Sequence, residues 1–222
     1  GVCHGFIGNR MLSPYGREAS LAVIEGAKPE EVDAALYNFG MPMGPMTMSD
    51  MAGVDIGYLN RQGMGRENYE TKAYDWVDRL VEQGRKGLKV GKGIYRYAEG
   101  DRTPQPDPEV MKVIEEESAK LGIERKPIPA EDIVERCMMA LINEGAKILG
   151  EGKAYRASDI DVVYVNGYGF PRYRGGPMHY ADTIGLKNVY AKIMEFQEKF
   201  GPRWWQPAPL LKELAESGKS FA

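Results

Sequence analysis

Few side chains in this sequence could act as a nucleophile, a proton carrier or a metal ligand. There are two histidines, His4 and His179, and two cysteines, Cys3 and Cys137. Their spacing matches no zinc-binding pattern, and two cysteines are too few for a disulfide framework. We therefore expect no metal site, and we interpret His179 as a structural or surface residue.

The segment 91–93, GKG, begins like a dinucleotide-binding fingerprint. Arg96 occupies the place of the third glycine, and no strand-to-helix pattern surrounds the segment. We expect this glycine pair to shape a turn, and we expect no cofactor to bind this chain through it.

Asn9, within the segment 5–12 (GFIGNRML), could hold a reacting oxygen. A carboxamide NH2 is a neutral donor, so it can hydrogen-bond either a hydroxyl or a keto oxygen. An asparagine at this position could also cap the helix that follows, which is a common role for Asn. The residue type alone favours the cap, and both roles remain open at this point.

The elements that must position such residues are mostly helical. Apolar residues recur at three- and four-residue spacing over 9–25, 28–40, 74–82, 108–121 and 133–149. Gly53 and Gly57 interrupt the stretch after the third methionine-rich turn, and 87–97 is the only segment with an extended pattern. Residues 98–108 are polar and contain three prolines, which is typical of a linker.

The second half of the sequence repeats the first. Ile7 and Arg10 match Ile133 and Arg136 at an offset of 126 (136 − 10). Further on, the blocks 44–46 and 176–178 both read GPM, each followed by an aspartate and a glycine. Amphipathicity alone does not dictate loop residues, so this order indicates a duplicated helical unit. We predict an all-α fold with domains at 1–100 and 129–222, joined by a linker with a helix at 101–128.

Bulk properties narrow the class of protein. The chain has 222 residues, 43% hydrophobic and 27% charged, with a net charge of −3. No basic run suggests a nucleic-acid partner, and no apolar stretch is long enough to span a membrane. The chain starts without Met and without a signal-peptide pattern. We expect it to be part of a longer protein.

The motifs resemble those of the 3-hydroxyacyl-CoA dehydrogenases. Residues 5–12 are similar to the start of the C-terminal domain of that family, and 43–55 and 91–97 are similar to its later blocks. Segments 135–137, 143–145, 161–163, 167–171 and 175–178 resemble the second domain of multifunctional fatty-acid oxidation enzymes, which also carry an enoyl-CoA hydratase.

The resemblance implies oxidation of 3-hydroxyacyl-CoA in fatty-acid β-oxidation. A His-Glu pair and NAD would belong to a nucleotide-binding domain outside this chain, so this part alone should be inactive. Asn9 would orient the C3 oxygen of an acyl-CoA substrate, which reverses the preference for a cap. The competing hypothesis is a non-catalytic helical module for domain assembly or dimerisation.

Met43, Gly44 and Pro45 are the remaining candidates for substrate contact. Five methionines lie between 41 and 51, and methionine adapts to an apolar chain, although core packing explains them equally well. Met43, Gly44 and Pro45 are preferred because their loop follows the second helix, near where Asn9 should point.

The second copy should be degenerate. It has Glu135 where the first has Asn9, and a carboxylate lacks the neutral donor. We expect the two copies to pack as an internal pseudo-dimer, leaving the chain monomeric. By resemblance the protein would be cytoplasmic in a bacterium and peroxisomal in a eukaryote.

Overall fold

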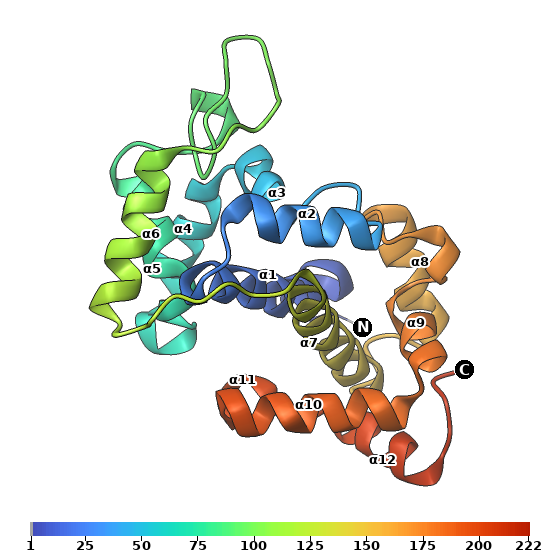
Figure 1. Cartoon of the computed structure of the whole chain (residues 1–222). Helices are drawn as coiled ribbons and strands as arrows, with labels where there is room; N and C mark the ends of the chain where they lie inside the picture. The colour runs from blue at the N-terminus through green and yellow to red at the C-terminus, as the bar shows by residue number, and fades with distance from the viewer. Residues whose placement is uncertain (1) are drawn as a thin grey trace. The chain divides into compact units, whose positions relative to one another are not determined.

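The protein is built from α-helices. A computed structural model describes residues 2–222, and over this range it contains twelve α-helices and no β-strand (Figure 1). The predicted all-α class is therefore confirmed for the described residues. Residue 1, the first residue of the predicted first domain, lies outside them.

The first half contains six α-helices. Each except α1 begins at or near a proline, a glycine or a polar residue, as expected for helix starts. Their bounds are α1 (Phe6–Glu25), α2 (Pro29–Phe39), α3 (Pro45–Ala52), α4 (Val54–Met64), α5 (Thr71–Glu82) and α6 (Pro108–Lys120), with short 3-10 turns η1 (Arg66–Asn68) and η2 (Leu88–Val90).

The second half contains six more α-helices over the described range. Their bounds are α7 (Ala130–Gly150), α8 (Ala157–Gly167), α9 (Pro177–Ile184), α10 (Leu186–Phe200), α11 (Pro202–Trp205) and α12 (Pro209–Ser217), with η3 at Arg172–Arg174. The order long helix, helix, proline-started short helix is the same as in α1, α2 and α3.

The first helix begins three residues earlier than the sequence predicts. Gly5 and Phe6 both have positive φ angles, +73° and +52°, and the N–H of Asn9 already donates to the carbonyl of Gly5 at 3.2 Å. Asn9 therefore lies one turn inside α1 and is not its cap. The prediction of a start at Asn9 was wrong because the turn that begins the helix depends on a left-handed conformation at Phe6, which only glycine favours.

The helix α4 is absent from the sequence prediction. Gly57 and Gly63 lie within it, and three of its apolar side chains, Ile56, Leu59 and Met64, are exposed. Glycine has low helix propensity, and apolar residues that do not gather on a buried face hide the helical period.

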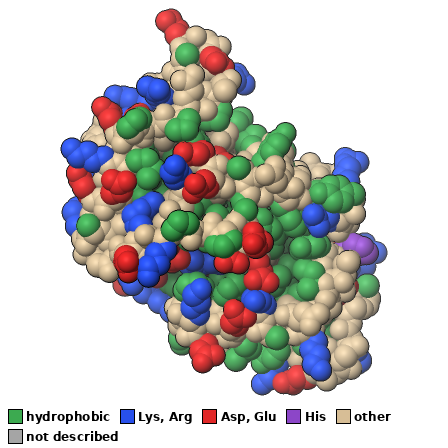
Figure 2. Space-filling model, in the orientation of Figure 1, with side chains coloured by type: hydrophobic (Ala, Val, Ile, Leu, Met, Phe, Trp, Pro, Cys, Tyr) green, Lys and Arg blue, Asp and Glu red, His purple; other side chains and the backbone are tan. Residues whose placement is uncertain are grey.

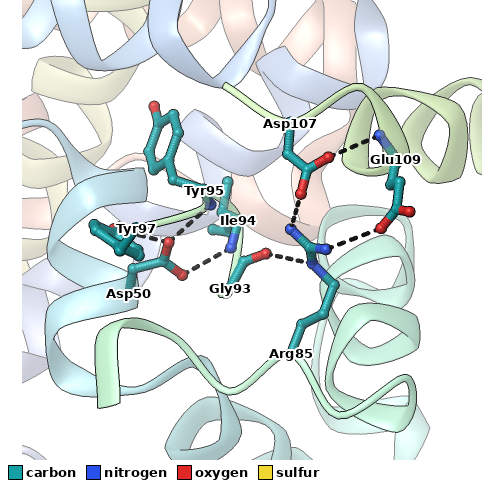
Figure 3. A network of polar contacts seen from close by, with 8 residues as sticks. All are labelled: Asp50, Arg85, Gly93, Ile94, Tyr95, Tyr97, Asp107 and Glu109. Atoms are coloured by element: carbon teal, nitrogen blue, oxygen red, sulfur yellow. Dashed lines mark hydrogen bonds and ion pairs between the residues drawn. The ribbon is translucent and has the colours of Figure 1, made fainter. Parts of the chain in front are cut away.

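The segment predicted as extended is a turn. Residues 87–97 contain η2 and isolated backbone bridges, Gly87 with Lys92 and Lys92 with Arg96. Asp50 of α3 takes the place of a neighbouring strand: its carboxylate accepts the N–H groups of Ile94 and Tyr95, each at 2.8 Å (Figure 3). A side chain thus satisfies donors that a sheet would otherwise satisfy.

Arg85 ties this turn to the start of α6. Its guanidinium is buried and donates to the carbonyl of Gly93 at 2.8 Å and to the carboxylate of Asp107 at 2.6 Å (Figure 3). Asp107 in turn caps α6 by accepting the N–H of Glu109 at 3.0 Å. The predicted linker region therefore carries a capped helix that is anchored through a buried ion pair.

The chain divides into two compact units, each with its own core. One, the α7–α12 unit, holds the chain up to Gly16, Gly40–Pro42 and Val134–Ala222. The other, the α2–α6 unit, holds Arg17–Phe39 and Met43–Ile133. Their largest fully buried side chains include Tyr164, Phe170 and Trp205 in the first, and Leu36, Trp76 and Leu80 in the second. The predicted domain boundaries at 100 and 129, and the pseudo-dimer, stay predictions.

The same polar device recurs inside each unit. In the α2–α6 unit, Asp33 of α2 accepts the N–H groups of Met46 and Thr47 at 2.8 and 2.9 Å. In the α7–α12 unit, Asp161 of α8 accepts those of Met178 and His179 at 2.7 and 3.2 Å. Both carboxylates thus occupy the positive end of a short helix, α3 or α9. The pairing of His179 with Thr47 in the repeat alignment agrees with these contacts.

The shared GPM loop follows from this device. A Cβ on Gly44 would lie 2.1 Å from a carboxylate oxygen of Asp33, and one on Gly176 would lie 2.4 Å from the Asp161 side chain. Only glycine leaves room for the carboxylate, and the proline that follows starts the helix without needing an N–H partner. A second aspartate also recurs, since Asp182 accepts the N–H of Phe221 at 2.9 Å as Asp50 does in the first copy.

We expect Asp33→Ala to lower the free energy of unfolding by about 3 kcal/mol, because buried donors lose their acceptor. Besides the two backbone groups, Asp33 accepts the hydroxyl of Tyr95 at 2.9 Å. Urea unfolding of the chain measures the effect, and Asp101→Ala, at an exposed loop position, serves as control with a change of at most ~0.5 kcal/mol. Equal unfolding midpoints for the two variants would contradict this assignment.

Candidate active-site asparagine

Asn9 is exposed one turn inside α1, and its carboxamide is held from one side only. Its Oδ1 accepts the hydroxyl of Tyr168 at 2.7 Å. Its NH2 group donates to no residue within 2–222. The arrangement leaves the donor side of the amide available to a ligand, which is the chemistry predicted for this residue.

Tyr168 is itself fixed by two neighbours. Its ring stacks on Tyr164 with centroids 4.9 Å apart and planes 22° apart. The hydroxyl of Tyr164 donates to the carbonyl of Gly8 at 2.8 Å, and a Cβ on Gly8 would lie 2.1 Å from the Tyr168 ring. The glycine before Asn9 thus makes room for the aromatic ring that contacts Asn9.

Both tyrosines keep their protons at physiological pH. Burial raises the pKa of Tyr164 and that of Tyr168 above the ordinary value for a phenol. The hydroxyl of Tyr168 is therefore a stable donor to Asn9. Sequence reasoning did not find either tyrosine, although the segment 167–171 was recognised for its resemblance to the family.

The next residue, Arg10, joins α1 to α7. Its guanidinium donates to Glu144 at 2.7 Å and forms two parallel bonds with Glu151 at 2.7 and 2.8 Å. The hydrogen bonds with Glu151 raise the pKa of Arg10. A two-carboxylate clamp of this kind fixes the first turns of α1, and with them the backbone that carries Asn9.

The equivalent of Asn9 in the second copy has a different environment. Glu135 lies in α7 and pairs with Lys192 of α10 at 3.3 Å. A carboxylate already engaged with a lysine offers no donor to a substrate oxygen.

The other predicted site residues lie in the α2–α6 unit. Gly44 and Pro45 are buried at the start of α3, where they accommodate Asp33, and Met43 is partly exposed. The structure thus explains Gly44 and Pro45 through the helix start. Contact of Met43, Gly44 and Pro45 with substrate stays a proposal.

Gly91 and Gly93 shape a turn, as predicted. Gly91 ends η2 with φ of +75°, and a Cβ on Gly93 would lie 2.0 Å from Oδ1 of Asp50. A carboxylate at this place would repel a pyrophosphate, so these glycines do not fit NAD.

The histidines are exposed, and other groupings are few. His4 and His179 both face solvent. Among the described residues, no three His, Cys, Asp or Glu side chains are grouped as metal ligands would be. No helix within 2–222 is long and apolar enough to cross a membrane. On the face drawn in Figure 2, Lys and Arg alternate with Asp and Glu.

Comparison with known proteins places these features in a family context. The family model described as "3-hydroxyacyl-CoA dehydrogenase, C-terminal domain" matches the chain twice, over residues 5–97 and 133–220. The two matches coincide with the two copies seen in the sequence.

Curated relatives are longer proteins. The peroxisomal bifunctional enzyme of Homo sapiens is 42% identical, over 98% of this chain and 32% of its own length. The fatty acid oxidation complex subunit alpha of Shewanella halifaxensis is 36% identical, over 98% of this chain and 30% of its own. The chain thus spans about a third of the length of these relatives.

Solved structures share the fold. The dehydrogenase part of multifunctional enzyme 1 from C. elegans matches with a TM-score of 0.76 at 26% identity, covering 95% of this chain and 48% of that one. The 3-hydroxybutyryl-CoA dehydrogenase of Escherichia coli matches with a TM-score of 0.71 at 20% identity, covering 96% and 60%. The second likeness concerns the fold alone.

Proposed function

Because the chain belongs to the family of 3-hydroxyacyl-CoA dehydrogenase C-terminal domains, we propose that it forms the substrate side of an NAD-dependent 3-hydroxyacyl-CoA dehydrogenase of fatty-acid β-oxidation. Relatives named for fatty-acid oxidation, among them the complex subunit from Shewanella, support this assignment. The longer protein would also carry an enoyl-CoA hydratase, as the name "bifunctional enzyme" suggests.

The observation that carries the proposal is the half-satisfied carboxamide of Asn9. With Oδ1 occupied by Tyr168, the NH2 group faces outward as a neutral donor. It would hold the C3 oxygen of a 3-hydroxyacyl-CoA, and it would keep that bond when the hydroxyl becomes a ketone. The oxygen is then oriented without a charge that would favour one form over the other.

Other tasks of the reaction would belong to a domain outside this chain. NAD, bound there, would supply the hydride acceptor, and a His-Glu pair would take the hydroxyl proton. Met43, Gly44 and Pro45 are proposed to line the acyl-CoA side. The same reasoning places the protein in peroxisomes if its source is a eukaryote, in line with the names of such relatives, and in the cytoplasm if it is bacterial.

Turnover by the natural full-length protein tests the proposal. Acetoacetyl-CoA and NADH are supplied, and loss of NADH absorbance is followed for the wild type and for Asn9→Ala. Turnover that depends on Asn9 supports the proposal. Turnover that is indifferent to Asn9 would favour the competing role, a helical module for domain assembly.

We expect the isolated chain to be monomeric. A duplicated domain can form within one chain the isologous contact that two separate subunits would otherwise share. Light scattering at several concentrations measures the mass, for which one chain corresponds to 24.8 kDa. A stable dimer that persists on dilution would contradict the internal pairing.

A further inference from the structure

We infer that Tyr168, which belongs to the second copy, is a positioning residue for the Asn9 carboxamide of the first copy. The inference rests on the proposed function, in which Asn9 donates to the substrate oxygen. Tyr168 and Asn9 are 159 residues apart in the chain and lie in the two separate segments that match the family.

A carboxamide needs such a partner because its two ends are nearly equal in shape. Rotation by half a turn about the last side-chain bond exchanges the NH2 group and the oxygen, and an exposed asparagine has little to prevent it. In the rotated state a lone pair of Oδ1 would face the C3 oxygen and could not hydrogen-bond a ketone. The hydroxyl proton of Tyr168, given to Oδ1 at 2.7 Å, selects the state with NH2 outward.

Tyr168 is held well enough to exert this selection. Its ring is stacked on Tyr164, and the Tyr164 hydroxyl is tied to the carbonyl of Gly8 in the first turn of α1. Gly8 also leaves the space that the Tyr168 ring occupies. Helix α1 and the end of α8 are thereby linked at three adjacent points around Asn9.

The second copy then has a role in the reaction as well as in packing. Its own equivalent of Asn9 is Glu135, which is paired with Lys192. It could not orient a substrate oxygen itself, yet through Tyr168 it completes the site of the first copy.

The test uses Tyr168→Phe in the natural full-length protein, because this change removes only the hydroxyl and keeps the stacked ring. We expect kcat with acetoacetyl-CoA and NADH to fall ~10-fold, since the donor is mispositioned for part of the time. The KM for acetoacetyl-CoA should stay within about twofold, and the melting temperature should be unchanged within error, because the bond is at the surface.

A double variant separates positioning from a general effect. If Tyr168 acts through Asn9, the variant Asn9→Ala/Tyr168→Phe should be no slower than Asn9→Ala alone. Gly8→Ala should reproduce the loss seen for Tyr168→Phe, since its methyl group displaces the ring while favouring the helix. Tyr155→Phe, at a tyrosine that is 93% exposed, is the matched control and should equal the wild type.

The outcomes are distinguishable. Wild-type kcat in Tyr168→Phe, or losses that multiply in the double variant, would overturn the positioning role while leaving the role of Asn9 intact. If Asn9→Ala itself were fully active, the proposed function would fail, and the inference would fail with it.

Discussion

The isolated chain should show no dehydrogenase activity. With acetoacetyl-CoA and NADH, absorbance is expected to stay at the level of the blank. The chain lacks a recognisable dinucleotide fingerprint, and its glycine pair at 91 and 93 surrounds the carboxylate of Asp50. Loss of the general base lowers a rate by roughly 10²–10⁴-fold, and loss of the bound hydride acceptor removes the reaction altogether.

The natural full-length protein, assayed at equal concentration, is the control for this result. Its turnover shows that the substrate and the assay are adequate. Measurable turnover by the clean isolated chain would mean that its own residues bind the nucleotide, and the assignment of NAD to another domain would have to be abandoned.

Asn9→Ala in the full-length protein should lower kcat/KM by ~10²-fold, as removal of one donor to a reacting oxygen does elsewhere. The free energy of unfolding should change by no more than ~1 kcal/mol. The variant loses one exposed hydrogen bond to Tyr168, but alanine is a better helix former than asparagine at this position inside α1.

Asn9→Asp sharpens the same experiment. The shape and the acceptor for Tyr168 are kept, while the NH2 donor is replaced by a second carboxylate oxygen. A loss at least as large as that of Asn9→Ala would show that the donor matters and not the volume. An active Asn9→Asp together with a destabilised Asn9→Ala would instead assign Asn9 to the stability of α1.

Several features could be predicted from the sequence because they depend on residues close together in the chain. The helical period gave the approximate bounds of α1, α2, α6 and α7, and the family motif singled out Asn9. The recurring GPM blocks revealed the duplication, which the twofold family match bears out. Local geometry was less certain: the start of α1 depends on left-handed angles at Gly5 and Phe6, and α4 was hidden by its glycines.

The partners of these residues were decided only by the tertiary structure. Gly44 is required by Asp33 of the preceding helix, and the turn at 94–95 is held by Asp50, 44 residues earlier than Ile94. The clearest case is Asn9, whose oxygen meets Tyr168 across 159 residues. Periodicity records which face of a helix is apolar. It does not record which hydroxyl the packed helices bring to a particular carboxamide, because that choice depends on distances that exist only after the core has formed.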